Sequence, residues 1–341
     1  NTNPPIATPE LAREVAEKAR RESPARVYFK AAMTAGRQGR ELADVDALAR
    51  EPSVVALSDD GDPVVRFDVM EQACRAAARA GLVLCPHCED SPRSIAQYES
   101  GARTGFEPGE SGENEANYIE RDARLAARWG CRVHFSHVSM AASVAALRRL
   151  RAEQAAPVTF EVTPHHLLLC ARDYAGGDVP KVNPPLRTPQ DLEALRGALE
   201  NGEADAVASD HAPHTALDKA QGACGLIGLE TTLGAILTHF VHPGRLEPLR
   251  AAALLSTQPA RILGLPAGSL ATGCPADAVL IDPEERWIVR ADEFASRSRN
   301  TAFGGWSMRG RSLGVLVGGR LEGARPSLEA RIEQAGGGGM P

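Results

Sequence analysis

The sequence has no uncharged apolar run that approaches the ~18 residues of a membrane-spanning helix, so we expect no span across a bilayer. It has no block of lysine and arginine either, and its net charge of −6 argues against a surface that binds nucleic acid. We also expect no signal peptide. Membrane and nucleic acid are therefore excluded as expected partners.

A cysteine pattern typical of disulfide-stapled domains is missing as well. The seven cysteines are an odd number and are scattered along the chain, at positions 74, 85, 88, 131, 170, 224 and 274. Such scatter is typical of free thiols in a reducing cytoplasm, where we expect the protein to reside. Cys85 and Cys88 have C-x-x-C spacing, but without a second cysteine pair this spacing is a weak signal for zinc.

What is present is an ordinary globular composition in a rather long chain. It has 341 residues, of which 43% are hydrophobic and 24% charged. One barrel domain takes about 250 residues, so the length predicts a large domain with a small appendage. We assign the large domain to residues 1–265 and a small β domain to 266–330, and we expect the glycine-rich residues 331–341 to be a disordered tail.

Short β-rich runs alternate with helical stretches rich in alanine, arginine and leucine, which is the pattern of a parallel sheet. The predicted strands are Arg26–Met33, Ser53–Ser58, Leu82–His87, Arg132–His137, Val158–Thr163 and Asp205–Asp210. The predicted helices between them are Asp68–Ala80, Tyr118–Trp129, Ala141–Glu153 and Thr188–Leu199. Six such units suit either an open, doubly wound sheet or a barrel that lacks two of its eight units.

Beyond about residue 265 the pattern changes to short strands and glycine turns. Val279–Asp282 and Leu313–Val317 predict antiparallel strands, and Gly318–Gly319 predicts a hairpin turn after the second of them. The chain begins at Asn1 without a methionine, which we interpret as a start inside a longer sequence. This interpretation favours the barrel that lacks its first units.

Polar residues gather at the carboxyl ends of the predicted strands, where barrel active sites are built. His87, His137 and Asp210 end three of them, and Asp59 and Asp60 follow a fourth. Two imidazoles and two carboxylates from separate strands form the ligand set that zinc prefers. Each residue also has a structural interpretation, as a hydrogen-bonding histidine or a helix-capping aspartate. Their coincidence at four strand ends makes a shared metal site as good an interpretation as four structural residues.

Side-chain alternation along a strand separates His134 from His137. Residues three apart in a strand point to opposite faces, so we predict that His137 points into the barrel mouth and that His134 packs outward. His214 lies in the loop after Asp210 and can bend over a bound ligand. His165 and His166 are adjacent, and we interpret both as structural, with one of them possible support for a ligand residue.

The chain resembles the dihydroorotases of the bacterial type I branch, in the amidohydrolase superfamily. The resemblance covers nearly the whole chain, and its DHAPH and VNPPLR elements are highly specific. The matching stretches are NTNPP (1–5), SDDG (58–61), HCED (87–90), HFSHVS (134–139), EVTPHHLLL (161–169), KVNPPLR (181–187), SDHAPHT (209–215), GLETTLG (228–234), PARILGL (259–265) and the AD of PADAVLID (275–282).

This resemblance implies an α/β fold, a (β/α)8 TIM-type barrel that lacks its first strands in this chain, with a small β-sandwich domain. It implies one or two zinc ions, with His87 and His137 as ligands of one and Asp60 as a ligand that can bridge two. Asp210 would bind the other ion and act as the catalytic acid and base. Lys30 is the alternative bridging ligand, as a carboxylated lysine; the DDG element favours Asp60 and leaves Asp59 as a capping residue.

For the substrate, the resemblance implies a set of five binding residues. The carboxylate of the substrate would contact Asn1 and His214. Its ring amide groups would contact Asn183 and the backbone around Cys224 and Gly225. Such enzymes also carry a His-x-His pair on their first strand, followed by an arginine. No histidine precedes His87 here, so we expect two barrel units and half of the small domain to lie outside this chain, which would then be inactive alone.

The implied activity is the reversible, zinc-dependent hydrolysis of the cyclic amide of dihydroorotate to N-carbamoyl-aspartate, a step of de novo pyrimidine (UMP) biosynthesis. One alternative is a hydantoinase or allantoinase that acts on a five-membered cyclic ureide. Another is a catalytically silent relative that serves as a scaffold for aspartate transcarbamoylase. The expected partner is a small-molecule substrate; we also expect a homodimer, with an aspartate transcarbamoylase assembly as a further possibility.

Overall fold

The computed structural model describes residues 2–110, 112–153, 157–174, 180–326 and 328. Asn1 and the predicted tail at 331–341 lie outside the described residues. Among the helices that are described, none is both long and apolar enough to cross a membrane.

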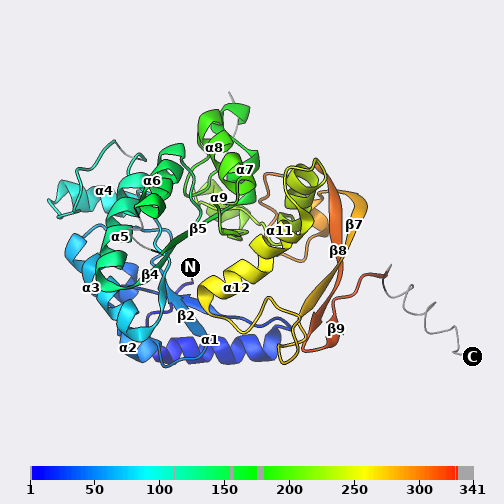
Figure 1. Ribbon diagram of the computed structural model, residues 1–341, viewed down its shortest axis with the longest axis horizontal. Helices are drawn as coiled ribbons and strands as arrows, with labels where there is room; N and C mark the ends of the chain where they lie inside the picture. Colours follow the sequence, from blue (N-terminus) through cyan, green and yellow to red (C-terminus); the bar gives the residue numbers. More distant parts are fainter. Residues whose placement is uncertain (1, 111, 154–156, 175–179, 327, 329–341) are drawn as a thin grey trace, which may run out of the picture.

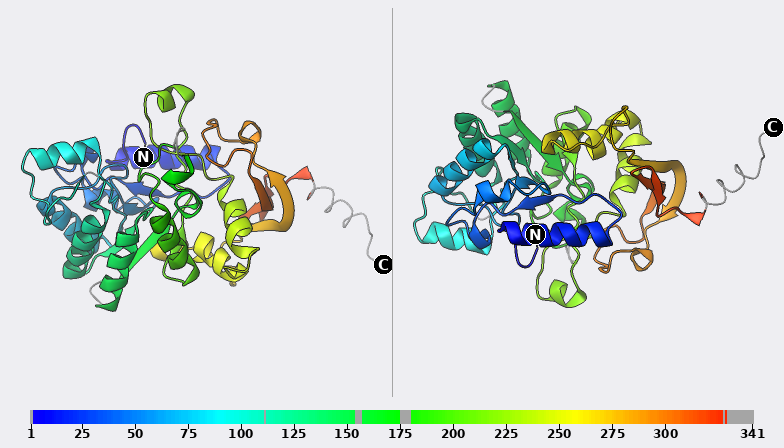
Figure 2. Two further views of the ribbon diagram at one scale, coloured as in Figure 1. Left: turned by 90° about the horizontal axis from the view of Figure 1, so that it is seen from above. Right: turned by 90° about the horizontal axis from the view of Figure 1, so that it is seen from below.

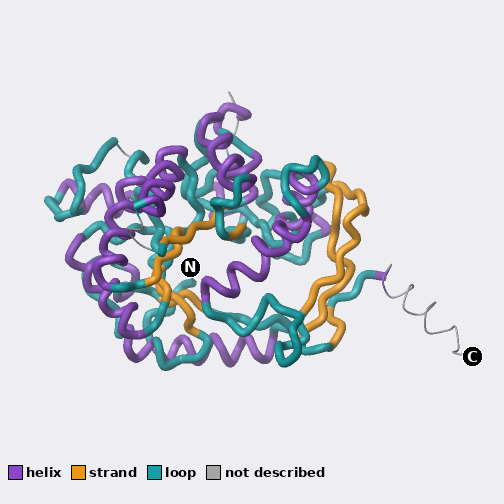
Figure 3. The backbone as a smooth tube through the Cα atoms, in the orientation of Figure 1, coloured by secondary structure: helices purple, strands orange, loops and turns teal. Residues whose placement is uncertain are grey.

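Six parallel strands form one sheet in chain order, from β1 to β6. Each of the six predicted strands is confirmed, although most are shorter than predicted. Figure 3 shows that this sheet curls into an arc, which gives half of a barrel. The strands are β1 Phe29–Ala31, β2 Val54–Leu57, β3 Val83–Leu84, β4 Arg132–Phe135, β5 Val158–Val162 and β6 Ala206–Val207.

Helices cover the outer face of the curled sheet (Figure 1), which confirms the barrel and makes the doubly wound alternative wrong. Helices α2, α3, α5, α6 and α8 each pack against the next. The helices of the barrel region are α1 Pro9–Glu22, α2 Val45–Leu48, α3 Phe67–Ala80, α4 Pro92–Glu99, α5 Glu115–Trp129, α6 Ala141–Ala152, α7 Pro164–Leu168, α8 Pro189–Glu200, α9 Ala216–Ala220, α10 Thr232–Ile236, α11 Pro248–Ala252 and α12 Gln258–Leu263. Short 3-10 turns occupy Ala35–Arg37 and Ala171–Tyr174, and π-helical turns occupy Leu237–Val241 and Ala253–Thr257.

Alternation of side chains along the strands separates the core from the hollow of the half-barrel. In β5, Val158, Phe160 and Val162 are buried, whereas Thr159 and Glu161 are partly exposed. Phe160 pairs with Phe135 of β4, and both rings are fully buried in the apolar core. Glu161 lines the hollow, so this strand turns its apolar face outward to the helices and its polar face inward.

Glycine ends two of the outer helices and returns the chain to the sheet within one or two residues. Helix α3 ends at Gly81 (φ 71°) and α5 at Gly130 (φ 65°), both in the left-handed conformation that closes a helix. Strands β3 and β4 follow directly. These short connections fix where the two strands begin and therefore where their carboxyl ends lie.

A second, antiparallel sheet of three strands lies at one end of the molecule (Figures 1 and 2). Its strands are β7 Ala278–Ile288, β8 Ser307–Val317 and β9 Arg320–Glu322, with a 3-10 turn at Ala291–Glu293. The predicted strands and the hairpin turn at Gly318–Gly319 are confirmed. The segment between β7 and β8 reaches back to the barrel loops, where Ser298 Oγ donates to His214 O at 2.8 Å and Ile227 N donates to Asn300 O at 3.0 Å.

The contact between this sheet and the barrel depends on Gly310 of β8. Gly310 is buried at φ 98°, a Cβ atom there would overlap the side chain of Leu237, and its carbonyl accepts a hydrogen bond from Trp287 Nε1 at 3.1 Å. We predict that Gly310→Ala lowers the free energy of unfolding by about 3 kcal/mol, because a left-handed alanine and an overpacked contact each cost about 1–2 kcal/mol. Urea denaturation measures this loss.

Gly244 is the matched control. It also has a positive φ, of 75°, but a Cβ atom there would meet nothing within 4 Å. Gly244→Ala should therefore cost only the backbone contribution, about 1 kcal/mol. Equal losses in the two variants would contradict the proposed packing at Gly310.

Candidate metal centre and active site

The carboxyl ends of β2, β3 and β4 lie side by side, because these strands are parallel and paired in direct succession. Asp60 follows the end of β2 by three residues, His87 follows β3 by three, and His137 follows β4 by two. The sheet therefore delivers all three side chains to one place, as the sequence predicted for strand-end residues.

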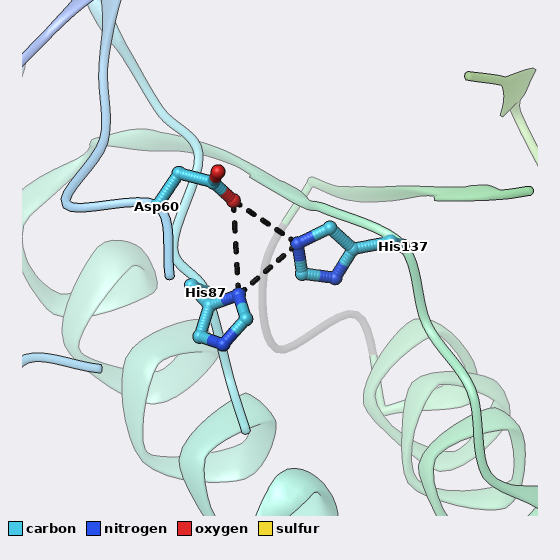
Figure 4. Close-up of side chains that lie close together, drawn as sticks. All are labelled: Asp60, His87 and His137. Carbon is cyan, nitrogen blue, oxygen red and sulfur yellow. Dashed lines mark hydrogen bonds and ion pairs between the residues drawn. The ribbon is translucent and has the colours of Figure 1, made fainter. Parts of the chain in front are cut away.

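These three side chains point toward one another (Figure 4). His87 Nδ1 lies 3.1 Å from His137 Nε2, and His137 Nε2 lies 3.1 Å from Asp60 Oδ1. The remaining separation, between His87 Nδ1 and Asp60 Oδ1, is 3.7 Å. The imidazole rings stand edge to face at 75° and are buried, whereas the carboxylate reaches the hollow. Two imidazole nitrogens and one oxygen thus face a common point.

Electrostatics sets distinct protonation states within this group. Burial opposes charge on Asp60, but hydrogen bonds from His137 and His87 outweigh it and hold the pKa of the carboxyl well below its usual range. Burial lowers the pKa of His137, but its hydrogen bond to Asp60 and the charges of the nearby carboxylates together outweigh burial and raise this pKa to about 9. Burial lowers the pKa of His87. At neutral pH, a proton on His137 therefore balances the charge of Asp60.

The chemistry of these donors fits a divalent cation. Their ligand atoms all lie within 4.8 Å of one another, and they form the one group of this kind among the described residues. Imidazole nitrogen with carboxylate oxygen is a set that zinc and similar ions prefer. Neither Cys85 nor Cys88 belongs to it; both are buried free thiols, and burial raises the pKa of Cys85 to about 11.

A cavity of about 760 Å³ opens beside this group. Asp60 and His137 line it together with Lys30, Glu161 and Asp210. Asp210 follows the end of β6 by three residues, and burial raises the pKa of its carboxyl. The structure therefore brings Asp210 to the same cavity, where its carboxylate lies 3.8 Å from His165 Nε2.

Lys30 belongs to a different interaction in the same cavity. Its Nζ lies 4.0 Å from Glu161 Oε1 and 3.5 Å from Ser136 Oγ. Burial raises the pKa of Glu161, but Lys30 and His134 outweigh this effect and lower it to about 2. Lys30 is thus the counter-ion of Glu161, a carboxylate whose side chain is only 13% exposed.

The residues predicted to bind substrate fall in two groups. Asn183 Nδ2 lies 3.1 Å from His87 Nε2. His214 Nε2 lies 2.8 Å from the carbonyl oxygen of Cys224, and Gly225 follows at φ 128°, where a Cβ atom would overlap that of Ala212. His214, Cys224 and Gly225 thus lie close together, whereas Asn1 lies outside the described residues.

The neighbouring Asp59 has the capping role predicted for it. It is buried, and its Oδ1 accepts hydrogen bonds from the backbone of Met33 at 2.8 Å and of Thr34 at 3.1 Å; Thr34 Oγ1 donates to Oδ2. The two adjacent aspartates thus have different roles: Asp59 stabilises the turn after β1, and Asp60 faces the cavity.

The prediction that His134 packs outward is wrong. His134 is buried inside the half-barrel, where its Nε2 lies 3.0 Å from Glu161 Oε2 and its Nδ1 lies 2.9 Å from Thr159 Oγ1. Strand alternation does not extend to His137, because the backbone there adopts a left-handed φ of 38°. This local turn brings both histidines to the inner side.

Sequence reasoning gave no individual role to Glu161 or Arg187. Glu161 had a detectable signal, because it is the polar member of an alternating strand whose other face is apolar. His166, in contrast, is structural as predicted: its ring nitrogens lie 2.8 Å from Thr163 Oγ1 and 3.0 Å from Pro184 O. Its neighbour His165 faces Asp210 instead.

Comparison with known proteins decides the family. Residues 5–321 match the profile of the Amidohydrolase family. The dihydroorotase of Bacillus caldolyticus is 38% identical over 330 residues, which are 94% of this chain and 77% of that protein. The dihydroorotase of Pelotomaculum thermopropionicum is 40% identical over 304 residues, or 86% of this chain and 70% of that one. This chain belongs to the amidohydrolase family, in its dihydroorotase branch.

A solved amidohydrolase structure agrees with the fold. The L-hydantoinase (dihydropyrimidinase) of Arthrobacter aurescens superposes with a TM-score of 0.79 at 25% identity, over 94% of this chain and 75% of that one. The curled sheet with its outer helices is therefore the barrel of this family, and the resemblance stated from the sequence motifs is confirmed.

The two adjacent aspartates of this amidohydrolase allow a matched test of the metal group. We predict that Asp60→Asn weakens zinc binding at least a hundredfold, because it removes the one carboxylate that faces both imidazoles. Asp59→Asn should keep zinc affinity and instead lower the free energy of unfolding by about 2 kcal/mol, because it disrupts buried backbone hydrogen bonds. Competition with a chromophoric chelator and urea denaturation measure the two effects.

A Lys30→Gln variant completes this comparison. If Asp60 is the carboxylate ligand, Lys30→Gln retains zinc. Loss of zinc in this variant, with retention in Asp60→Asn, would reverse the assignment.

The pKa of His137 predicts how zinc binding depends on pH. Since this pKa is raised to about 9, the ion must displace a proton from His137 at any lower pH, whereas Asp60 stays ionised and His87 neutral at pH 7. Zinc affinity should therefore rise by close to tenfold per pH unit between pH 7 and about 9, and level off above. Titration calorimetry in buffers of different ionisation enthalpy measures the proton released; a flat profile would contradict the assignment.

Proposed function

We propose that the protein is a dihydroorotase, which reversibly hydrolyses the cyclic amide of dihydroorotate to N-carbamoyl-aspartate in de novo pyrimidine (UMP) biosynthesis. The observation that carries this proposal is the convergence of Asp60, His87 and His137 on one point beside a cavity that Asp210 also lines. Relatives named dihydroorotase, 37–40% identical over most of the chain, support the choice of substrate.

The same residues support zinc as the cofactor, with one or two ions. Asp60, His87 and His137 would hold one ion, and Asp210 would be a ligand of a second. An ion bound by such a set supplies Lewis acidity and a water that is activated for attack near neutral pH. The counter-ion role of Lys30 supports Asp60, rather than a carboxylated lysine, as the bridging ligand.

Asp210 is proposed as the group that moves the proton. In hydrolysis, water adds to the ring carbonyl carbon and the carbon–nitrogen bond breaks. A carboxylate at this position takes one proton from the attacking water and gives it to the departing nitrogen. Burial raises the pKa of Asp210, which makes its protonated form more accessible. The reverse reaction uses the same group in the opposite order, so the ionised form of Asp210 begins hydrolysis and its protonated form begins ring closure.

Substrate binding is proposed for Asn183, His214 and the backbone of Cys224 and Gly225, with Asn1 as a further contributor. Asn183 already approaches the metal group through His87. Lys219 Nζ donates to Gly225 O at 3.0 Å and to Ala223 O at 2.8 Å, so the backbone beside Cys224 is held in place. Such a fixed loop suits recognition of a planar ring amide.

We further propose that the protein works in the cytoplasm as a homodimer, with assembly on aspartate transcarbamoylase as a further possibility. All seven cysteines are free in the structure, which supports a reducing compartment. The substrate is a small molecule, as it is for enzymes of this family.

A hydantoinase is the second candidate, because the Arthrobacter aurescens enzyme shares the fold at a TM-score of 0.79. Its identity of 25% is well below the 38–40% of the dihydroorotases. The silent scaffold is less well supported, because the three grouped ligands are intact. Zinc content separates that scaffold from an enzyme, and a substrate panel separates the two enzymes.

We propose that residues 1–341 are inactive alone, because no His-x-His pair precedes His87 to complete the metal ligands. A fusion that adds the segment that the Bacillus caldolyticus relative has outside the matched 330 residues should restore turnover. In this fusion, we predict hydrolysis of dihydroorotate in preference to hydantoin. Asp210→Asn should reduce the rate at least a thousandfold, since general acid–base catalysis contributes about 10²–10⁴-fold and a ligand is weakened as well.

Asp277→Asn is the control, because Asp277 pairs with Arg26 on the surface, away from the cavity. It should retain the full rate. Turnover of hydantoin without dihydroorotate would transfer the protein to the second candidate. A normal rate from residues 1–341 alone would contradict the proposal that this chain is inactive by itself.

A further inference from the structure

Arg187 makes four polar contacts with loops that are distant in the sequence. Its Nη2 pairs with Glu89 Oε2 and lies 3.7 Å from Glu115 Oε2. Its Nε donates to Ser139 Oγ at 3.0 Å, and its Nη1 donates to the carbonyl oxygen of Gly112 at 3.0 Å. One guanidinium therefore joins four separate segments of the chain.

Two of these partners stand directly beside the histidines of the metal group. Glu89 is two residues beyond His87, and Ser139 is two residues beyond His137. Arg187 itself follows Asn183 by four residues, and Asn183 contacts the His87 ring. The contacts of Arg187 thus connect the backbone turns that carry both imidazoles with the loop that touches one of them.

Three of the side chains that contact Arg187 are buried. Glu89, Glu115 and Ser139 are each at most 3% exposed. Glu115 Oε1 also accepts hydrogen bonds from Ser139 N at 3.0 Å and Met140 N at 3.2 Å. The turn after His137 is therefore fixed from two sides, by a carboxylate at its backbone and by a guanidinium at its hydroxyl.

The contacts at this position suit arginine, because three different nitrogens of its guanidinium reach three different partners. A planar guanidinium offers five donors in fixed directions, whereas a lysine ammonium is a compact charge on a flexible stem. A buried ion pair is by itself weak evidence of stabilisation, because desolvation offsets the attraction. The position of this ion pair is the informative feature. Arg187 contacts a residue of the turn that follows His87 and a residue of the turn that follows His137.

We propose that Arg187 is a positioning residue that holds His87 and His137 at the separation a metal ion needs. This inference rests on the metal site of the proposed function. Arg187 touches neither the cavity nor the grouped ligand atoms, so it acts through Glu89 and Ser139. Without it, the two turns can move independently and the imidazoles lose their fixed spacing.

The test compares zinc affinity, measured by competition with a chromophoric chelator, in the wild type and in Arg187→Gln/Glu89→Gln. This double variant removes both members of the Arg187–Glu89 pair, so neither is left buried without its partner. We expect zinc affinity to fall 10–100-fold, the usual effect of losing a residue that orients a ligand. The visible absorption of bound Co²⁺ should also change, because it reports ligand geometry.

Arg151→Gln/Asp205→Asn is the matched control. Arg151 Nη2 pairs with Asp205 at the start of β6, at the opposite end of the strands, and Arg151 also donates to Val158 O. This variant should lower the melting temperature without zinc, yet keep zinc affinity within about twofold of the wild type.

Wild-type affinity in Arg187→Gln/Glu89→Gln, or an equal loss in the control, would overturn the proposal. Should the double variant fail to fold, Arg187→Lys decides: we expect at least threefold weaker zinc binding, and unchanged binding overturns the proposal. A wild-type protein without zinc affinity would overturn the metal site and this inference with it. A wild type that binds zinc, with His87→Ala weakened and Arg187 variants unaffected, overturns the positioning role alone.

Discussion

Parallel pairing of β2, β3 and β4 is the constraint on which the candidate site depends. His87 and His137 are 50 residues apart, and Asp60 and His137 are 77 apart, so no local motif can bring them together. Parallel strands need a crossover between them, and here each crossover passes through an outer helix. The carboxyl ends consequently meet on one edge of the curled sheet, and any error in register would move a ligand away from its partners.

Concentrating ionisable groups at this edge has an electrostatic cost, which the surrounding residues reduce. A proton on His137 balances Asp60, and Lys30 balances Glu161. These pairs explain how several carboxylates can line one cavity in a buried region, where isolated charges are costly. A divalent ion would replace the proton of His137, so the charge balance of this group suits a cation.

Much of this arrangement could be predicted from the sequence. The alternation of β-rich and helical runs predicted all six parallel strands, because successive parallel strands need a crossover between them that is usually a helix. The place of Asp60, His87, His137 and Asp210 at strand ends predicted that they would meet. The capping role of Asp59 followed from the choice of its neighbour Asp60 as the metal ligand.

Other features depended on backbone geometry or on distant loops. His134 was misplaced because alternation cannot foresee a left-handed residue at His137. The contacts of Arg187 join segments from residue 89 to residue 187, and no local pattern reports which loops will meet. The same alternation could have placed Glu161 in the cavity, but only once the inner face of β5 was known.

The most direct test of the central claim is anomalous scattering at the zinc absorption edge, from crystals grown with zinc. The account predicts a peak bounded by His87 Nδ1, His137 Nε2 and a carboxylate oxygen of Asp60, at distances of about 2.0–2.2 Å. An empty site between these three groups, with zinc bound elsewhere or not at all, would contradict it.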